Sequence, residues 1–317
     1  MARARRSKSR RGGFGRVIGW VIRAFFVFII LSVLWVLLYR FVPPPITFTM
    51  MGDALGGRGI TKDWTPIDEI DRDMVRAAIA AEDSKFCTHA GFDQDAIAAA
   101  MRRNAEGRGV IRGGSTISQQ TAKNAFLWQG GGYVRKGLEA WYTLLIENLW
   151  DKRRIMEVYL NIAETGIGTY GVTAGAERYF GKDASSLSRQ EAARIAAVLP
   201  LPKKRAAIAP SGFTRRYGNS IAKRIGVVAR DGLDACVYEA GEAAPEPAES
   251  AVKPSRPKAK APPPPPPPER VEDYIEPAPV EAEPEPEPTA TPEPGIVPEE
   301  PVTNGLTLLT SSRQKPG

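Results

Sequence analysis

An apolar stretch close to the N-terminus, AFFVFIILSVLWVLLY at residues 24–39, constrains this chain more than any other feature. With its flanks it covers residues 17–42, which is long enough for a helix to cross a bilayer while Arg23 extends toward the interface. A cleaved signal peptide is the alternative, but the run is long and the flanking RFVPPPITF lacks a small-x-small cleavage site. The sequence therefore predicts one transmembrane helix between a basic segment, 1–16, and a stalk, 43–64, with short extended pieces.

Charge is spread unevenly over the 317 residues, whose net charge is +7. Residues 1–45 carry nine basic residues and no acidic ones. Basic residues before a span favour a cytoplasmic N-terminus, so we expect the chain after residue 45 to lie outside the cytoplasm. Because the basic cluster adjoins a membrane segment, the net charge gives no reason to expect a nucleic-acid partner.

The C-terminal segment, residues 241–317, differs in composition from everything before it. It holds 21 of the 28 prolines, including the run from Pro262 to Pro268, and 14 acidic against 7 basic residues. Such a segment cannot bury a hydrophobic core, and we expect an extended, disordered tail.

Residues 65–240 show the periodicity and breaks of a mainly α domain. Strand signals are few. Pro200 ends one helix, and Ser188 with Glu191 forms a capping box at the start of that helix. The pattern predicts helices at 71–87, 93–105, 116–127, 133–150, 152–163, 172–180 and 189–199.

An acidic residue, Glu82, interrupts the apolar face of the first of these helices. It shares helical spacing with Ile79 and Phe86, so burial should raise the pKa of its carboxyl and suit it to proton transfer. Asp83, the next residue, can accept hydrogen bonds that fix the local geometry. An ordinary buried ion pair, for example with Arg76, is the alternative.

A second polar group begins a later helix, in RGGSTISQQTAKNAF at 112–126. Thr116 can cap the helix with Gln119 as its capping-box partner, and the free N–H groups beside Arg112 and Lys123 suit an anion such as phosphate. The stretch is not a P-loop, because no lysine directly follows the glycine pair.

A third group lies in YVRKGLEAWYTLLIENLW, residues 133–150, where Glu139 borders an apolar stripe. Arg135, four residues earlier, is placed to pair with it. A surface salt bridge and a second active-site carboxylate are both compatible with this pattern.

The two cysteines, Cys87 and Cys236, lie on the side of the membrane where disulfides form. One bridge from the start of the domain to its end and two buried free thiols are both possible.

Four stretches in this order and spacing resemble the peptidoglycan glycosyltransferase family: EDSKFCTHAGFD, GGSTISQQTAKN, RKGLE and RIMEVYLN. The resemblance covers roughly residues 65–205, and GVTAGAERYFGK at 171–182 resembles a fifth block of the family. It implies a lysozyme-like two-lobed glycosyltransferase domain that polymerises lipid II in the inner membrane, facing the periplasm. No S-D-N or K-T-G motif follows the S-x-x-K of Ser220, which argues against a second, transpeptidase domain.

The resemblance also implies roles. Glu82 would be the general base and Glu139 a second catalytic carboxylate, which either holds a divalent Mg or Mn ion or orients nearby cations. Any such metal would be shared with substrate phosphates, since the sequence contains no carboxylate cage. Lys123 and Arg135, with Arg112 and Lys136 behind them, would stabilise the leaving pyrophosphate. The candidate substrate-binding residues are Asp83, Phe86, His89, Arg112, Ser115, Thr116, Gln119, Gln120, Lys123, Asn124, Arg135 and Lys136, of which His89 is expected mainly to fix the loop after the first helix.

Other interpretations remain open at this point. A lysozyme-like hydrolase would use Glu82 as general acid, with water as acceptor. A membrane-anchored scaffold would act through the tail, which is also a candidate contact for cell-wall synthesis or division proteins. Aromatic and apolar residues around the second and third groups could contact membrane lipid or simply pack in the core: Phe126, Leu127, Trp128, Tyr133, Trp141 and Trp150.

Overall fold

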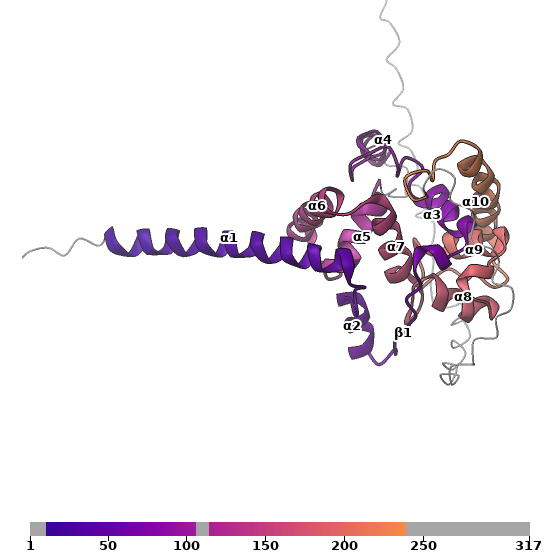
Figure 1. Ribbon diagram of the computed structural model, residues 1–317, viewed down its shortest axis with the longest axis horizontal. Helices are drawn as coiled ribbons and strands as arrows, with labels where there is room; N and C mark the ends of the chain where they lie inside the picture. The colour runs from indigo at the N-terminus through magenta and orange to yellow at the C-terminus, as the bar shows by residue number, and fades with distance from the viewer. Residues whose placement is uncertain (1–10, 106–113, 239–317) are drawn as a thin grey trace, which may run out of the picture. The chain divides into compact units, whose positions relative to one another are not determined.

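The computed structural model describes residues 11–105 and 114–238, and these residues form a mainly α-helical fold, as expected (Figure 1). The helices are α1 (Arg11–Phe41), α2 (Phe48–Leu55), α3 (Arg72–Glu82), α4 (Gln94–Ala105), α5 (Ile117–Phe126), α6 (Gly132–Leu149), α7 (Lys152–Ile162), α8 (Val172–Phe180), α9 (Arg189–Val198) and α10 (Gly212–Arg230), with short 3-10 turns at Ile67–Glu69 and Ala184–Ser186. Three short strands, β1 (Thr61–Lys62), β2 (Glu164–Gly166) and β3 (Thr169–Tyr170), form a sheet in the order β1-β3-β2.

The sheet is small and mixed. β1 runs parallel to β3, with Thr61 opposite Thr169 and Lys62 opposite Tyr170. β2 runs antiparallel to β3, with Glu164 opposite Tyr170. The sheet therefore joins the segment after α2 to the turn between α7 and α8.

Helix α1 includes Gly15–Phe41, the one helix among the described residues that is long and apolar enough to cross a membrane. Most of its surface is exposed, and its C-terminal part contacts the other helices. Trp150 Nε1 donates a hydrogen bond to the Val36 carbonyl at 2.9 Å, and Trp141 Nε1 donates to Ser32 Oγ at 3.1 Å. These contacts tie the end of the apolar helix to α6, as expected for a membrane anchor next to a folded domain.

Residues 43–64, expected to be a stalk of short extended pieces, contain the short strand β1 but also a helix. They contain α2, capped by Thr47, whose hydroxyl accepts a hydrogen bond from Met50 N at 3.3 Å. Met50 is fully buried, and the buried Asp53 accepts a hydrogen bond from Tyr170 at 2.7 Å. An eight-residue helix is too short to show a periodic pattern, which is why the sequence did not reveal it.

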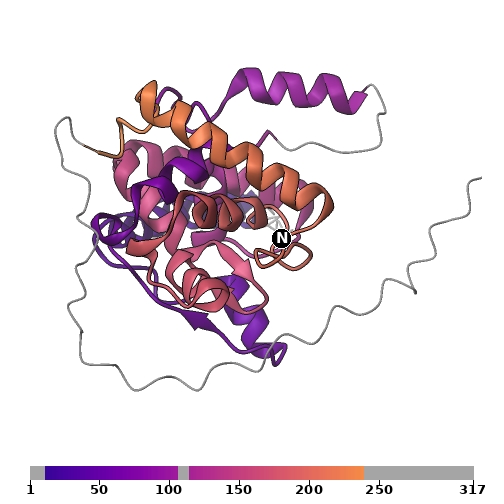
Figure 2. The ribbon, with the colours of Figure 1, turned by 90° about the vertical axis from the view of Figure 1, so that its right-hand side faces the viewer.

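Helices α3, α9 and α10 pack closely because small residues face one another. Ala77 and Ala78 of α3 and Ala193 and Ala197 of α9 are fully buried. Gly218 of α10 is also buried, and a Cβ placed there would lie 3.8 Å from Ala197 Cβ. The close packing of α10 against α9, also visible after a 90° turn (Figure 2), supports the end of α3, where the functional residues begin.

Six of the seven helices predicted in the domain begin and end within one residue of their predicted bounds. The first predicted helix, 71–87, ends at Glu82, because residues 83–89 turn away from the helix axis. Helices α2 and α10 were not predicted.

Candidate active site

Glu82 is the last residue of α3, and its carboxylate faces the polar side of α5. Its Oε2 atom accepts a hydrogen bond from Gln120 Nε2 at 2.9 Å. Its Oε1 atom is buried and has no hydrogen-bond partner among the described residues. One oxygen of the carboxylate is therefore held in place while the other is left for a ligand.

Burial raises the pKa of the Glu82 carboxyl above its ordinary value. The hydrogen bond from Gln120 and the charges of Arg205 and Lys123 lower this pKa in part, and the nearby charge of Asp83 raises it. A carboxylate whose pKa is brought closer to the working pH is a better proton acceptor than an ordinary glutamate.

Asp83 fixes the backbone on both sides of this carboxylate. It is buried, it pairs with His89 Nε2 at 2.9 Å, and its Oδ2 atom accepts a hydrogen bond from Ile117 N, the first residue of α5, at 3.0 Å. Because His89 Nδ1 accepts from Gly91 N at 3.1 Å, the ring proton lies on Nε2 and points at Asp83. Asp83 and His89 thus hold the end of α3 against the start of α5, rather than lining the pocket described below.

The loop between α3 and α4 is held in place by contacts of Phe86 and Lys152. Phe86 is fully buried, and the Lys152 ammonium lies 4.7 Å from the centre of its ring. Lys152 also donates to the His89 carbonyl and pairs with Glu147, each at 2.8 Å. Phe86 is therefore part of the support for the site and makes no contact with the pocket described below.

The start of α5 has the predicted capping box. Thr116 Oγ1 accepts from Gln119 N at 3.1 Å, and Gln119 Oε1 accepts from Thr116 N at 3.0 Å. The Oε1 atom of the buried Gln119 is therefore engaged by the cap, and the residue does not line the pocket described below; its role in binding stays a prediction. Ser115 is exposed before the helix, and Arg112 lies outside the described residues.

Glu139 is 3% exposed and sits between two cations of its own helix. Arg135 Nη1 lies 2.9 Å from Glu139 Oε2, and Lys136 Nζ bonds Glu139 Oε1. The sequence spacing indicated the first of these pairs. Both oxygens of this carboxylate are engaged, which distinguishes it from Glu82.

The ammonium group of Lys123, on α5, interacts electrostatically with both carboxylates, those of Glu82 and Glu139. Burial lowers the pKa of its ammonium group, whereas the charges of Glu139 and Glu82 raise it and those of Arg135 and Lys136 lower it further. The site therefore brings together Glu82 from α3, Lys123 from α5 and, from α6, Glu139 with its two paired cations, Arg135 and Lys136.

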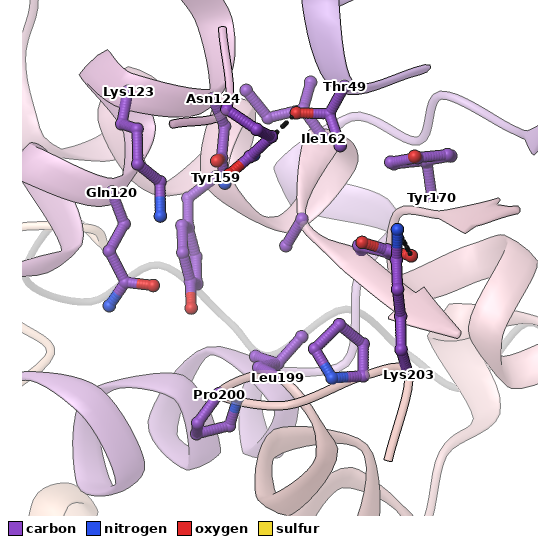
Figure 3. Close-up of a pocket in the computed structure, with 14 residues that line it drawn as sticks. Thr49, Gln120, Lys123, Asn124, Tyr159, Ile162, Tyr170, Leu199, Pro200 and Lys203 are labelled. Carbon is purple, nitrogen blue, oxygen red and sulfur yellow. Dashed lines mark hydrogen bonds and ion pairs between the residues drawn. The ribbon is translucent and has the colours of Figure 1, made fainter. Parts of the chain in front are cut away.

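A pocket of about 300 Å³ opens beside these residues (Figure 3). Gln120, Lys123 and Asn124 of α5 form one wall, and the segment from Leu199 to Lys203 faces them across the opening. The complete lining is Thr49, Gln120, Lys123, Asn124, Gln129, Tyr159, Ile162, Ala163, Glu164, Tyr170, Leu199, Pro200, Pro202 and Lys203.

Several of these lining residues were not identified from the sequence. Tyr159 and Glu164 lie in or next to RIMEVYLN, a motif that could have drawn attention to them. Lys203 pairs with Glu164 at 3.5 Å and with Asp53 at 3.3 Å, and nothing in its local sequence indicates this. Thr49 belongs to the helix that the sequence did not reveal.

The described residues do not form a metal site of their own. No group of three or more His, Cys, Asp or Glu side chains among them could hold a metal ion. The carboxylate proposed as a metal ligand, Glu139, has both oxygens directed at Arg135 and Lys136. A divalent ion shared between Glu139 and the substrate phosphates stays a prediction.

Cys87 and Cys236 form a disulfide, with a Cα–Cα distance of 5.4 Å and 149 residues between them in sequence. The bridge joins the loop after Glu82 to the segment after α10. The disulfide therefore links the start and the end of the domain close to its candidate active site.

A helical domain attached to an apolar helix, with a partly buried glutamate beside cations and a polar pocket, has the characteristics of a membrane-associated enzyme. The family model described as "Transglycosylase" matches residues 50–225. Relatives named "Biosynthetic peptidoglycan transglycosylase" include proteins of Caulobacter vibrioides (52% identity; 68% of this chain and 94% of the relative), Rhodospirillum centenum (50%; 63% and 87%) and Jannaschia sp. (45%; 68% and 89%). The chain therefore belongs to the transglycosylase family.

Proposed function

We propose that this transglycosylase polymerises lipid II into linear glycan strands of peptidoglycan and releases undecaprenyl pyrophosphate. The enzyme class, a peptidoglycan glycosyltransferase, follows from the family match and from relatives about 50% identical. The observation that supports the mechanism most strongly is the Glu82 carboxylate. One of its oxygens is buried and has no hydrogen-bond partner among the described residues, and the other is held by Gln120, which lines the pocket together with Lys123.

In the proposed reaction, Glu82 acts as general base. Its Oε1 atom takes the proton from the 4-hydroxyl of the acceptor N-acetylglucosamine as that oxygen bonds to the anomeric carbon of the donor sugar. The bond from this carbon to the pyrophosphate oxygen breaks, and its electron pair leaves with the undecaprenyl pyrophosphate. Because attack and departure occur on opposite faces of the sugar, the anomeric configuration inverts.

The departing pyrophosphate needs positive charge close to where its own charge develops. Lys123 lines the pocket, and Arg135 and Lys136 lie on the neighbouring helix. Glu139, paired with both of them, would hold the two cations in position for this role. Gln120 would position the base, and Asn124 would contact the substrate.

Membrane attachment follows from the apolar helix, and we propose its finer topology. The basic residues before α1 support a cytoplasmic N-terminus, a periplasmic domain and anchoring in the inner membrane. The aromatic and apolar residues considered as lipid contacts differ in exposure, and Trp141, which is partly buried, donates a hydrogen bond to Ser32 of α1. Phe126, Leu127 and Trp150 are buried in the core, whereas Trp128 and Tyr133 are 43% and 97% exposed and can contact lipid.

The Pro-rich tail, residues 241–317, lies outside the described residues. We propose it as the segment that binds cell-wall synthesis or division proteins. Deleting it should leave lipid II polymerisation in detergent unchanged and abolish recruitment to growth sites in cells. Unchanged recruitment after deletion would contradict this proposal.

The direct test is incubation of the detergent-solubilised full-length protein with labelled lipid II, followed by separation of the products by length. Glycan strands that lengthen with time support the proposal. Shortening of added glycan strands without growth would instead indicate a hydrolase. Absence of both activities in a folded protein would favour the scaffold interpretation.

A further inference from the structure

Three buried polar atoms at or beside the pocket have no hydrogen-bond partner among the described residues: Glu82 Oε1, the hydroxyl of Tyr159 and Glu164 Oε1. Of these, Glu164 Oε1 forms an ion pair with the Lys203 ammonium at 3.5 Å, so Glu82 Oε1 and the Tyr159 hydroxyl are the two left to explain. Leaving a buried polar group unpaired costs free energy, so proteins rarely keep such groups without a use for them. The proposed mechanism accounts for the oxygen of Glu82. It gives no role to Tyr159.

Tyr159 comes from α7, where the core-facing side of the helix carries apolar residues. The residue is only 1% exposed, yet it lines the pocket. Figure 3 shows its hydroxyl at the end of a ring that points into the pocket beside the Gln120 side chain. Gln120 in turn donates a hydrogen bond to Glu82, the proposed base, whose charge also acts on the Tyr159 hydroxyl.

The electrostatic surroundings keep this tyrosine protonated. Burial raises the pKa of the Tyr159 hydroxyl well above its ordinary value, and the negative charge of Glu82 raises it further. A group that stays protonated throughout the pH range of the reaction acts only as a hydrogen-bond donor toward an oxygen that is losing its own proton.

We propose that Tyr159 is a substrate-positioning residue whose hydroxyl donates a hydrogen bond to the acceptor oxygen that Glu82 deprotonates. This inference rests on the proposed function. The acceptor hydroxyl then satisfies both unpaired atoms at once: it donates its proton to Glu82 Oε1 and accepts from Tyr159 through one lone pair. Its second lone pair is directed at the anomeric carbon of the donor. The tyrosine keeps its proton, so the proton and electron balance of the transfer is unchanged.

The test is Tyr159→Phe in the full-length protein, which removes only the hydroxyl. Because that hydroxyl has no hydrogen-bond partner among the described residues, the melting temperature should be unchanged or slightly higher. The kcat/KM for lipid II should fall about 10-fold, the effect of one lost hydrogen bond to the reacting oxygen. The acidic limb of the pH profile, which reports the base, should stay where it is in the wild type.

Tyr238→Phe is the matched control. Tyr238 is 8% exposed, and its hydroxyl is also buried without a hydrogen-bond partner among the described residues. Its ring packs under the Arg72 guanidinium at 4.3 Å, outside the pocket, and phenylalanine preserves that ring. This variant should polymerise lipid II at the wild-type rate.

A second measurement uses lipid II whose N-acetylglucosamine lacks the 4-hydroxyl. The wild type should bind this deoxy compound more weakly than lipid II, and the difference should shrink in Tyr159→Phe but persist in Tyr238→Phe. The inference is overturned if Tyr159→Phe polymerises at the wild-type rate, if it loses several degrees of melting temperature, or if the binding difference is the same in all three proteins. A wild type that makes no polymer would refute the proposed function itself.

Discussion

Two glutamates of one site, Glu82 at the end of α3 and Glu139 on α6, have the same carboxylate in contrasting surroundings. Glu139 is enclosed by Arg135 and Lys136, and both of its oxygens are paired. Glu82 has a neutral amide on one oxygen and no partner among the described residues on the other. The first arrangement surrounds the carboxylate with two cations, whereas in the second burial raises the pKa of the carboxyl and makes proton uptake easier. In the proposed mechanism, the surroundings and not the residue type decide which carboxylate acts as the base.

The largest expected effect is on catalysis by Glu82→Gln. Glutamine keeps the shape and can still contact Gln120, but it cannot take a proton. Lipid II polymerisation should fall by about 10³-fold, within the range for loss of a general base. Product length analysis with labelled lipid II measures this effect. A variant that retains a tenth of the wild-type rate would show that another group removes the proton.

Glu139→Gln should have a smaller effect on rate and a clear effect on stability. Removing this carboxylate leaves Arg135 and Lys136 facing each other without a counter-charge. Because Lys136 is half-exposed, we expect a loss of about 1–2 kcal/mol, below the full cost of breaking a buried ion pair. Thermal unfolding measures the loss, and the rate should drop about 100-fold through displaced cations. Unchanged stability would mean that the two pairs contribute nothing to the fold.

The next largest effect of the contrast between the two glutamates should be on the pH dependence of the reaction. A base must be ionised, so kcat/KM should fall about tenfold per pH unit below the pKa of Glu82. Because burial raises this pKa, the acidic limb should lie above 4.5, the ordinary value for glutamate. Since burial also lowers the pKa of Lys123, the basic limb should lie below 10.5. An acidic limb at or below pH 4.5 would contradict the assignment of Glu82 as the base.

The smallest expected effect is a gain in stability from Glu82→Gln. A carboxyl whose pKa is raised by folding favours the folded state at low pH and disfavours it as pH rises through the folded-state pKa. Replacing it should therefore stabilise the protein at pH 7 by about 1 kcal/mol, or a melting temperature about 2–4 °C higher. The gain should shrink below pH 4.5, where both states bind the proton. Glu82→Gln should thus raise the stability at pH 7 and Glu139→Gln should lower it. This difference in sign tests the comparison most sharply.

Much of this site could be predicted from sequence because its parts are local. The capping box of Thr116 and Gln119 and the pair of Arg135 and Glu139 depend on residues three and four positions apart. The break in the apolar face at Glu82 was visible for the same reason. Helical spacing alone brings such residues together.

Other features depend on contacts between distant segments and could not be predicted. The hydrogen bond between Glu82 and Gln120 joins residues 38 positions apart, and the ion pair between Asp53 and Lys203 joins residues 150 apart. The end of α3 was misplaced because Asp83 bonds the start of α5 instead of continuing the helix. Tyr159 looked like a core residue in a periodic pattern, and only the structure shows that it lines the pocket.

The most direct test of the contrast between the two glutamates is an infrared titration of the full-length protein, recorded as the difference between the wild type and Glu82→Gln. This difference isolates the carboxyl of Glu82. The account predicts that its protonated band persists to a pH above 4.5 and that the carboxylate band replaces it at the pH where polymerisation begins. A carboxyl that is already ionised below pH 4.5, with no link to the onset of activity, would contradict the account.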